Sequence, residues 1–213
     1  RLSPDYVKRN KLKESYEIIY KSSKKLQNTT ERLLDLAKLD SKGFIFNIKT
    51  VDIKKLIKEI IDFSSPSIMG TNIKITLSFP EEDIANFYSD EDKLEEIISN
   101  LLSNAIKYVD KEKGEIKIEI DDMFDNLNIR ITDNGIGISP DEIEGIFSRF
   151  KRGENEINSN IKGSGIGLSF VKQLTEYLKG RIYVKSEGVG QGATFTLTLP
   201  KGKEKYVGYN IIE

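Results

Sequence analysis

The first part of the chain shows apolar residues at a spacing of seven positions. This row consists of Leu12, Ile19, Leu26 and Leu33, and the row four residues on consists of Tyr16, Ser23, Thr30 and Ala37. Such spacing predicts one long helix over residues 5–40, with a seam that partner helices have to cover. Polar Ser23 and Thr30 within the seam favour a helix bundle over a simple two-stranded coiled coil.

A change of pattern after the long helix indicates a domain boundary. Gly43 breaks the helical spacing, and the alternation of Phe44, Phe46 and Ile48 predicts a short strand before helical spacing resumes at residues 52–63. We therefore divide the chain into a helical segment, residues 1–41, a globular domain, residues 42–200, and a C-terminal tail, residues 201–213.

Within the globular domain, strand patterns gather together instead of alternating one by one with helices. Strands are predicted at residues 72–79, 114–122, 126–133, 180–187 and 192–200. Helices are predicted at residues 90–109, with Asp90 as the N-cap, in a short segment through Phe147, and at about residues 165–179. This clustering predicts an α+β fold, a two-layer α/β sandwich preceded by the long N-terminal helix.

Composition excludes several classes of function. The 33 lysines and arginines nearly balance the 34 aspartates and glutamates, so no basic field favours nucleic acid or an anionic membrane. No apolar run approaches the roughly 18 residues that a membrane span needs, and we expect a cytoplasmic domain. Because the chain starts at Arg1, we expect a fragment of a longer protein, which at full length can carry a membrane anchor.

The chain contains neither histidine nor cysteine. Serine–histidine–aspartate chemistry, zinc sites made of histidine or thiolate ligands, and a histidine general base are therefore excluded for this chain acting alone. Its chemistry has to rest on Asp, Glu, Lys, Arg and Asn side chains.

The glycine cluster "GSGIGL", residues 163–168, is a candidate phosphate-binding turn. It has a leucine where a dinucleotide-binding motif has its third glycine, and the chain has no P-loop motif. Its glycines stand at the start of a predicted helix, where unpaired N–H groups bind phosphate. Basic residues lie just upstream, namely Lys151, Arg152 and Lys162. A phosphate cradle and a structural turn without a ligand both fit this segment.

A second glycine cluster, "DNGIGI", follows a predicted strand. Asp133 ends that strand and precedes Gly135 and Gly137, so its carboxylate projects where a flat ligand can approach bare backbone. An ionised carboxylate accepts a hydrogen bond from an exocyclic amino group, such as that of adenine. An Asp-Asn-Gly turn without a ligand is the other interpretation.

One face of the helix predicted at residues 90–109 is unusually polar. Asn100, Asn104, Lys107 and Tyr108 fall on this face, opposite apolar positions that point toward the core. Asparagine is a poor helix former, and its amide oxygen is a hard ligand that suits Mg²⁺. Two hydrogen-bonded surface amides are the alternative interpretation.

Four segments, taken in order, resemble the ATP-binding domain of sensor histidine kinases, within the superfamily that includes gyrase, Hsp90 and MutL. "NLLSNAIKY" is similar to the N box, "DNGIGI" to the first glycine box, "IFSRFKR" to the F box and "GSGIGL" to the second glycine box. The resemblance covers about residues 42–200 and implies a Bergerat-type fold with ATP and Mg²⁺ as cofactors.

The resemblance also implies residue roles. Asp133 would hold the adenine amino group with help from Thr194, and residues 151–164 would form a mobile lid over ATP. The implied catalytic residues are Asn104, which would bind Mg²⁺, and Lys107 and Arg152, which would contact phosphates. The implied nucleotide contacts are Asn100, Asn104, Lys107, Tyr108, Asp133, Gly135, Gly137, Ile138, Lys162, Gly163, Ser164, Gly165, Ile166, Gly167, Leu168 and Thr194.

Residues 5–41 resemble the second helix of the family's dimerisation and phosphoacceptor hairpin. The first helix of that hairpin, which carries the acceptor histidine, is absent. The resemblance therefore implies a histidine kinase whose acceptor helix comes from a missing segment or a second subunit. It also implies a homodimer at full length and a response regulator receiver domain as partner.

Asn100 bears on the type of reaction. ATPases and serine-directed kinases of the superfamily carry a glutamate four residues before the metal-binding asparagine, where it acts as general base. An amide cannot take up that proton, whereas a neutral imidazole acceptor is already a nucleophile near pH 7. The sequence therefore favours transfer to histidine. The alternatives are an ATP-binding regulatory module without catalysis and an ATPase of the gyrase type.

Overall fold

The computed structural model divides the chain into two compact units, Arg1–Gly43 and Phe44–Glu213. It describes residues 47–149, 151 and 165–207. In the first unit it describes only positions 15, 16, 19, 20, 22–24, 26, 27, 30 and 34. These positions are helical, as the seven-residue spacing predicts, and the side chains of Ile19 and Leu26 are 66% and 68% exposed. Leu12 and Leu33 of the expected seam lie outside the described residues.

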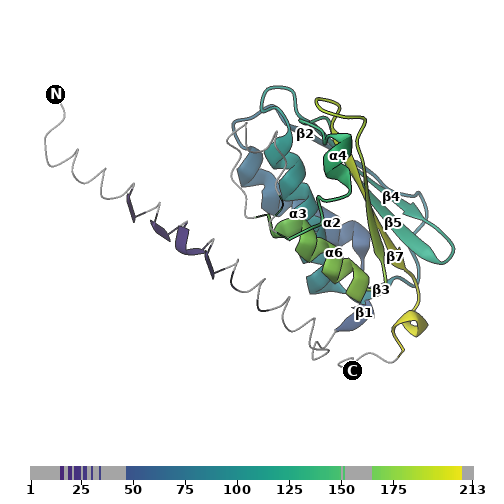
Figure 1. Ribbon diagram of the computed structural model, residues 1–213. Helices are drawn as coiled ribbons and strands as arrows, with labels where there is room; N and C mark the ends of the chain where they lie inside the picture. Colours follow the sequence, from purple (N-terminus) through teal and green to yellow (C-terminus); the bar gives the residue numbers. More distant parts are fainter. Residues whose placement is uncertain are drawn as a thin grey trace, which may run out of the picture. The chain divides into compact units, whose positions relative to one another are not determined.

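A five-stranded sheet forms the frame of the second unit (Figure 1). Its strands, in spatial order, are β2 (Lys74–Ser78), β4 (Glu115–Asp122), β5 (Asn126–Asp133), β7 (Ala193–Pro200) and β6 (Arg181–Lys185). β2 runs parallel to β4, and every other neighbouring pair is antiparallel. Mixed pairing of this kind agrees with the clustered strand patterns of the sequence.

Three helices pack on one face of this sheet, which we call the inner face (Figure 1). They are α2 (Ile53–Ile68), α3 (Glu91–Tyr108) and α6 (Gly167–Tyr177). The alternation along each strand turns its apolar residues to this side, where Ile118, Ile129 and Leu197 are at most 1% exposed. The two-layer α/β sandwich predicted from the sequence is confirmed.

A second, two-stranded sheet joins β1 (Ile48–Thr50) to β3 (Tyr88–Asp90) just before α3. Asp90 caps the helix as predicted, because one carboxylate oxygen accepts from the Lys93 N–H at 3.1 Å. Its other oxygen accepts from the Asn47 N–H at 2.9 Å. This buried carboxylate therefore fixes both the start of α3 and the entry of the chain into the domain.

α2 and α4 (Pro140–Ile143) differ in length from the sequence prediction. α2 extends through Ile68 and includes Pro66, although its buried residues end at Ile60. The last turns contain Ser64, whose hydroxyl donates to the Ile60 carbonyl at 2.8 Å. The short helix predicted through Phe147 is shorter, because α4 ends at Ile143 and the chain continues as turns.

The beginning of the predicted C-terminal tail packs against the domain. The 3₁₀ helix η1 (Lys203–Tyr206) ends with a fully buried tyrosine, and the Tyr206 hydroxyl donates to the Leu178 carbonyl at 3.3 Å. An aromatic side chain of this size contributes a large buried apolar area, which holds the segment in place. Within the part of the chain that the structure describes, no helix has the length and apolar character needed to span a membrane.

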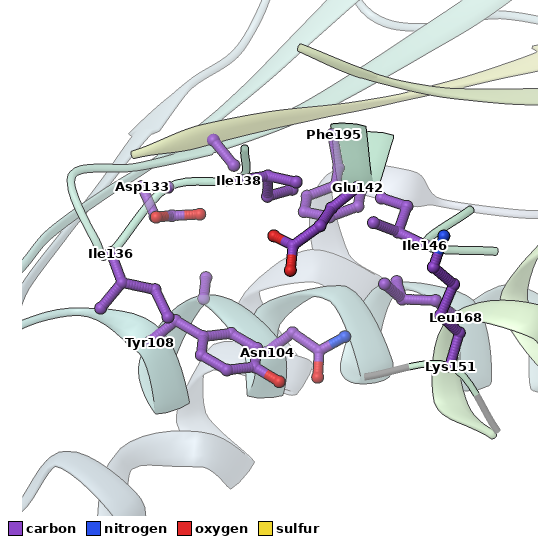
Figure 2. A pocket seen from close by; sticks show the side chains of 13 residues that line it. Asn104, Tyr108, Asp133, Ile136, Ile138, Glu142, Ile146, Lys151, Leu168 and Phe195 are labelled. Atoms are coloured by element: carbon purple, nitrogen blue, oxygen red, sulfur yellow. The ribbon is translucent and has the colours of Figure 1, made fainter. Parts of the chain in front are cut away.

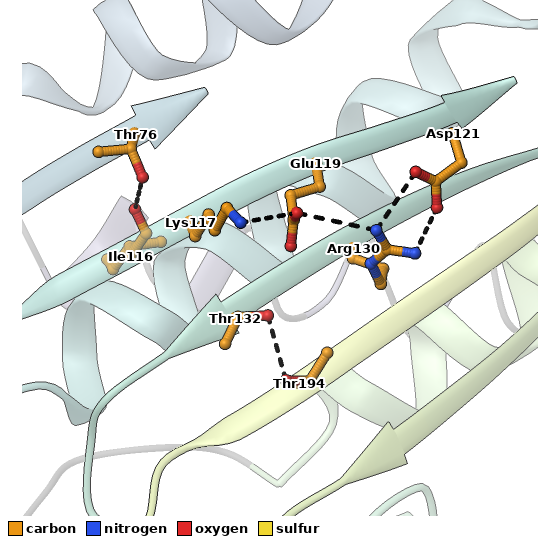
Figure 3. Close-up of polar contacts among 8 residues, drawn as sticks. All are labelled: Thr76, Ile116, Lys117, Glu119, Asp121, Arg130, Thr132 and Thr194. Atoms are coloured by element: carbon orange, nitrogen blue, oxygen red, sulfur yellow. Dashed lines mark hydrogen bonds and ion pairs between the residues drawn. The ribbon is translucent and has the colours of Figure 1, made fainter. Parts of the chain in front are cut away.

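The opposite, outer face of the sheet is polar (Figure 3). Glu119 on β4 is paired in register with Arg130 on β5. Its Oε1 also forms an ion pair with Lys117 Nζ at 2.8 Å. Arg130 reaches Asp121 as well, with its Nη2 at 3.2 Å from Asp121 Oδ1. Charge pairs of this kind on a solvated face keep the sheet soluble and contribute little net stability.

Candidate functional site

A pocket opens on the inner side of the sheet, between the end of β5 and the C-terminal half of α3 (Figure 2). Both elements reach this point because α3 packs along the apolar face that ends at Asp133. The pocket is lined by Asn104, Ala105, Tyr108, Asp133, Ile136, Gly137, Ile138, Glu142, Ile146, Lys151, Leu168, Ala193 and Phe195. Apolar walls with a few polar groups are typical of a small-molecule site.

Asp133 is the buried acid of this pocket. Its side chain belongs to the inner face at the last position of β5, and the residue is only 8% exposed. Burial raises the pKa of the Asp133 carboxyl above its usual range, while N–H groups of Gly135 and Ala193 act in the opposite direction. The Gly135 N–H donates to Asp133 Oδ1 at 2.8 Å. The backbone therefore fixes the orientation of an acceptor that has little access to solvent.

Two glycines after Asp133 are required by close packing. A Cβ at Gly135 would lie 2.5 Å from the Tyr108 carbonyl oxygen at the end of α3. Gly137 has a φ of +66°, and a Cβ there would overlap the Gly188 carbonyl oxygen. The Ile136 N–H donates to the same Tyr108 carbonyl at 3.1 Å. The "DNGIG" turn thus ties the end of β5 to the end of α3, which places Asp133 at the pocket wall.

The polar face of α3 reaches the pocket only in part. Asn104 and Tyr108 line it, and Lys107 lies beside them with its Nζ donating to the Tyr108 hydroxyl at 2.6 Å. Asn100, one turn earlier, is not among the lining residues. Its Nδ2 donates to the Glu96 carbonyl at 2.8 Å, and a Cβ at Gly167 would lie 3.3 Å from its Oδ1. Asn100 therefore bonds within α3, with its amide oxygen close to the start of α6, and it is not part of the pocket lining.

The second glycine cluster is described only from Gly165 onward. Gly165 has a φ of +68°, Ile166 is the N-cap of α6, and Gly167 is the first helical residue, so the helix predicted from about residue 165 begins two residues later. Leu168 is the member of this cluster that lines the pocket. The predicted contacts that lie outside the described residues are Arg152, Lys162, Gly163 and Ser164.

The expectation that Thr194 assists Asp133 needs correction. In the β5–β7 register, Asp133 pairs with Ala193 and Thr132 pairs with Thr194. Because neighbouring residues of a strand point to opposite faces, Ala193 shares the pocket face with Asp133 and Thr194 lies on the outer face. There its hydroxyl is 3.1 Å from that of Thr132 (Figure 3). We therefore remove Thr194 from the set of candidate ligand contacts.

Two further charged residues line the pocket: Glu142, which sequence reasoning missed, and Lys151, which it named only as a basic residue upstream of the second glycine cluster. Glu142 belongs to the motif Ser139-Pro-Asp-Glu142, which signals a helix start and says nothing about a ligand. Lys151 reaches back to Gly145, where a Cβ would collide with the lysine ammonium. Gly145 therefore leaves the space that the Lys151 side chain occupies.

Comparison with known proteins assigns the fold and the pocket to a family. Residues 89–203, more than half of the chain, match the family described as histidine kinase-, DNA gyrase B-, and HSP90-like ATPase. The matched range contains α3, the Asp133 turn and both strands that line the pocket. The chain belongs to this family, which confirms the resemblance seen in its sequence.

Similar proteins are histidine kinases. Histidine kinase P4 of Formosa agariphila is 35% identical over 93% of this chain, and sensor histidine kinase WalK of Bacillus subtilis is 32% identical over 84%. The chain spans only 14% and 30% of the length of these two relatives.

Solved structures give the same picture. The catalytic domain of histidine kinase ThkA matches 74% of this chain and 99% of its own, with 25% identity and a TM-score of 0.64. Full-length ShkA in complex with AMPPNP matches 89% of this chain and 39% of its own, with 26% identity and a TM-score of 0.74. The sheet, its helices and the pocket therefore form a histidine kinase catalytic domain fold.

Proposed function

We propose that this chain is the catalytic part of a sensor histidine kinase, which binds Mg-ATP and transfers the γ-phosphoryl group to a histidine on another segment or subunit. The observation that carries this proposal is the buried Asp133 carboxylate, held by the Gly135 N–H at 2.8 Å at the wall of an apolar pocket. The ShkA complex with AMPPNP, an ATP analogue, supports the choice of ligand.

The Asp133 side of the pocket suits adenine. An ionised carboxylate accepts hydrogen bonds and donates none, so it selects a base that presents an amino group. The base would lie against apolar side chains such as Ile138, Leu168 and Phe195, which contribute contact area without competing polar groups. Guanine presents a carbonyl oxygen at the position of the adenine amino group, and a carboxylate repels it.

The other polar groups of the pocket suit a triphosphate with its metal ion. The Asn104 amide oxygen is a hard ligand, and Mg²⁺ usually combines one or two such protein ligands with phosphate oxygens and waters. The ion would neutralise phosphate charge when bound. Lys107, beside Tyr108, and Lys151, in the pocket lining, would contact phosphate oxygens. Arg152 and Lys162 remain proposed phosphate contacts on the basis of the sequence alone.

The residue at position 100 favours phosphoryl transfer to histidine over hydrolysis. Asn100 is engaged with the Glu96 carbonyl and packs at Gly167, so this position offers no carboxylate to activate water. Glu142 is a second carboxylate in the pocket lining. Because a carboxylate can activate water, a hydrolysis assay should include variants of Glu142. A neutral imidazole needs no general base to attack the γ-phosphorus.

The proposed partners lie outside this chain. They are a helix that carries the acceptor histidine, a second copy in a full-length homodimer, and the receiver domain of a response regulator. Histidine kinase ThkA, whose catalytic domain is 25% identical to this chain, has been solved in complex with response regulator protein TrrA. We place the domain in the cytoplasm, where ATP is available.

Incubation with γ-labelled ATP tests the function. The chain alone should bind Mg-ATP without labelling itself, because it has no histidine. Addition of a helical hairpin that carries the acceptor histidine should produce a label that is stable in base and lost in acid. Acid-stable labelling of the chain would indicate a hydroxyl acceptor and contradict the proposal. ATP binding without any transfer to the hairpin would favour a regulatory module, and rapid phosphate release would favour an ATPase.

A further inference from the structure

Glu142 is an acidic residue whose position in the pocket is set by its own helix. It is the third residue after the N-cap Ser139 of α4, and its Oε2 accepts from the Ser139 N–H at 3.4 Å in a capping box. In Figure 2 its carboxylate points into the pocket, between the aromatic ring of Phe195 and the amide of Asn104. The capping contact thus holds a negative charge at the middle of the site.

The neighbours of Glu142 define which part of a nucleotide it meets. Figure 2 shows its carboxylate between Asp133, proposed to hold the base, and Lys151, proposed to contact phosphates. A bound nucleotide with its base at Asp133 and its phosphates toward Asn104 and Lys151 would place its sugar between them. The carboxylate therefore lies where the sugar has to pass.

The chemistry of a carboxylate limits which groups of a nucleotide can bind Glu142. Among the described residues that line the pocket, only Asp133 and Glu142 are acidic. An ionised carboxylate cannot donate a hydrogen bond, and it repels phosphate oxygens in a partly enclosed site. Ribose hydroxyl groups are donors, and carboxylates accept from them in other nucleotide-binding folds. The 2′- and 3′-hydroxyls are thus the groups of ATP that match Glu142.

We propose that Glu142 is a specificity-determining residue that accepts a hydrogen bond from a ribose hydroxyl of the bound nucleotide. The proposal rests on the function proposed above and assigns to the same pocket a selection for ribonucleotides. α4 contributes to this selection because its capping box orients the carboxylate before the ligand arrives.

Calorimetric titration with ATP, 2′-deoxy-ATP and 3′-deoxy-ATP tests this role. The unmodified chain should bind at least one deoxy analogue about tenfold or more weakly than ATP, the effect of losing a hydrogen bond to a charged group. Glu142→Gln keeps the capping box, which accepts Glu or Gln, but removes the charge. Because the neutral amide oxygen is a weaker acceptor than the carboxylate, this variant should bind ATP more weakly and discriminate less between ATP and that analogue.

A matched control separates the specific role from a change in overall charge. Glu144→Gln removes the same charge two residues away, at an exposed position that does not line the pocket, and should keep the full discrimination. Comparable circular dichroism spectra and melting temperatures would show that both variants are folded.

Each remaining outcome has a distinct meaning. Failure of the unmodified chain to bind ATP would contradict the proposed function. ATP binding without discrimination against either analogue would overturn the role of Glu142 alone, as would unchanged discrimination in Glu142→Gln. Loss of the Mg²⁺ dependence in Glu142→Gln, with discrimination intact, would make Glu142 a metal ligand. Loss of ATP hydrolysis with discrimination intact would make it a general base.

Discussion

The two faces of the five-stranded sheet differ in the side chains that they carry and in what those side chains contact. On β5, Leu127, Ile129 and Ile131 face the helices and are at most 1% exposed, and the same row ends in Asp133. The outer row carries Arg130 and Thr132, which take part in polar contacts on the solvated side (Figure 3). The same alternation therefore supplies core residues along β5 and a pocket residue, Asp133, at its end.

Substitutions on the inner face of the sheet should have the largest effect on the free energy of unfolding. Ile129→Ala on the inner face should lower the free energy of unfolding by about 2–5 kcal/mol, since the lost contacts leave a cavity between the sheet and the helices. Chemical denaturation measures this change. Thr196→Ala on the outer face of β7 should cost less than about 1 kcal/mol. Similar losses for both variants would contradict the assignment of the two faces.

Nucleotide affinity should depend on the inner end of β5 and not on the outer face. Asp133→Ala should weaken ATP binding by about 1.5–3 kcal/mol, because it removes the proposed acceptor for the adenine amino group, and should abolish a preference for ATP over GTP. Calorimetric titration gives both values. Thr194→Ala, on the outer face, should bind ATP as the unmodified chain does. A dissociation constant of Asp133→Ala within about twofold of the original would contradict the role in adenine recognition.

The two asparagines of α3 offer a comparison of the same kind along a helix. Asn104→Ala should weaken Mg-ATP binding about tenfold and remove most of the gain that Mg²⁺ gives, because the amide oxygen is the proposed protein ligand of the ion. Asn100→Ala should retain the Mg²⁺ dependence, since its amide is bonded to the Glu96 carbonyl and does not line the pocket. Titration of ATP with and without Mg²⁺ distinguishes them. An unchanged Mg²⁺ dependence in Asn104→Ala would show that the ligand is another residue.

The raised pKa of Asp133 predicts opposite effects of pH on binding and stability. In its proposed role Asp133 accepts from adenine as an ionised carboxylate, so ATP affinity should fall as the pH drops through the raised pKa, at a higher pH than an aspartate with the ordinary value of 3.8 would require. Without nucleotide, the contribution of Asp133 to stability is present at low pH and is lost as the pH rises through the raised pKa.

Asp133→Asn tests this conflict between binding and stability. Near neutral pH it should raise the free energy of unfolding of the nucleotide-free chain, because the amide avoids the cost of a buried charge. It should also bind ATP weakly at every pH. Denaturation and titration at a series of pH values provide the measurement. A variant less stable than the original at neutral pH would show that the hydrogen bonds to Asp133 outweigh its burial.

The outer ion pairs should give the smallest effect. Lys117, and then Arg130, lowers the pKa of the Glu119 carboxyl, so the stability contributed by Glu119 is present above its ordinary pKa and is lost as the pH falls. These side chains are partly exposed, and Arg130→Met should change the free energy of unfolding by less than about 1 kcal/mol. High salt should reduce the effect further. A loss comparable to that of Ile129→Ala would show that the outer face is not merely solvated.

The sequence by itself determined the elements and the family of this protein. Period-two alternation predicted the strands that end at Asp133 and Pro200, and helical spacing with Asp90 as the cap predicted α3. Four motifs in order predicted the histidine kinase-like domain, which the family match confirmed. These features could be read directly because periodicity, capping and glycine turns depend on residues close together in the chain.

The tertiary structure decided which side chains meet at the pocket. The β5–β7 register, a contact between distant segments, turns Thr194 to the outer face and brings Ala193 to the pocket. Asn100 lies near the start of α6 and is not part of the lining, whereas α4 contributes Glu142 and the turns after α4 bring in Lys151. No spacing rule relates these residues, because their proximity follows from how separate elements pack and not from any local pattern.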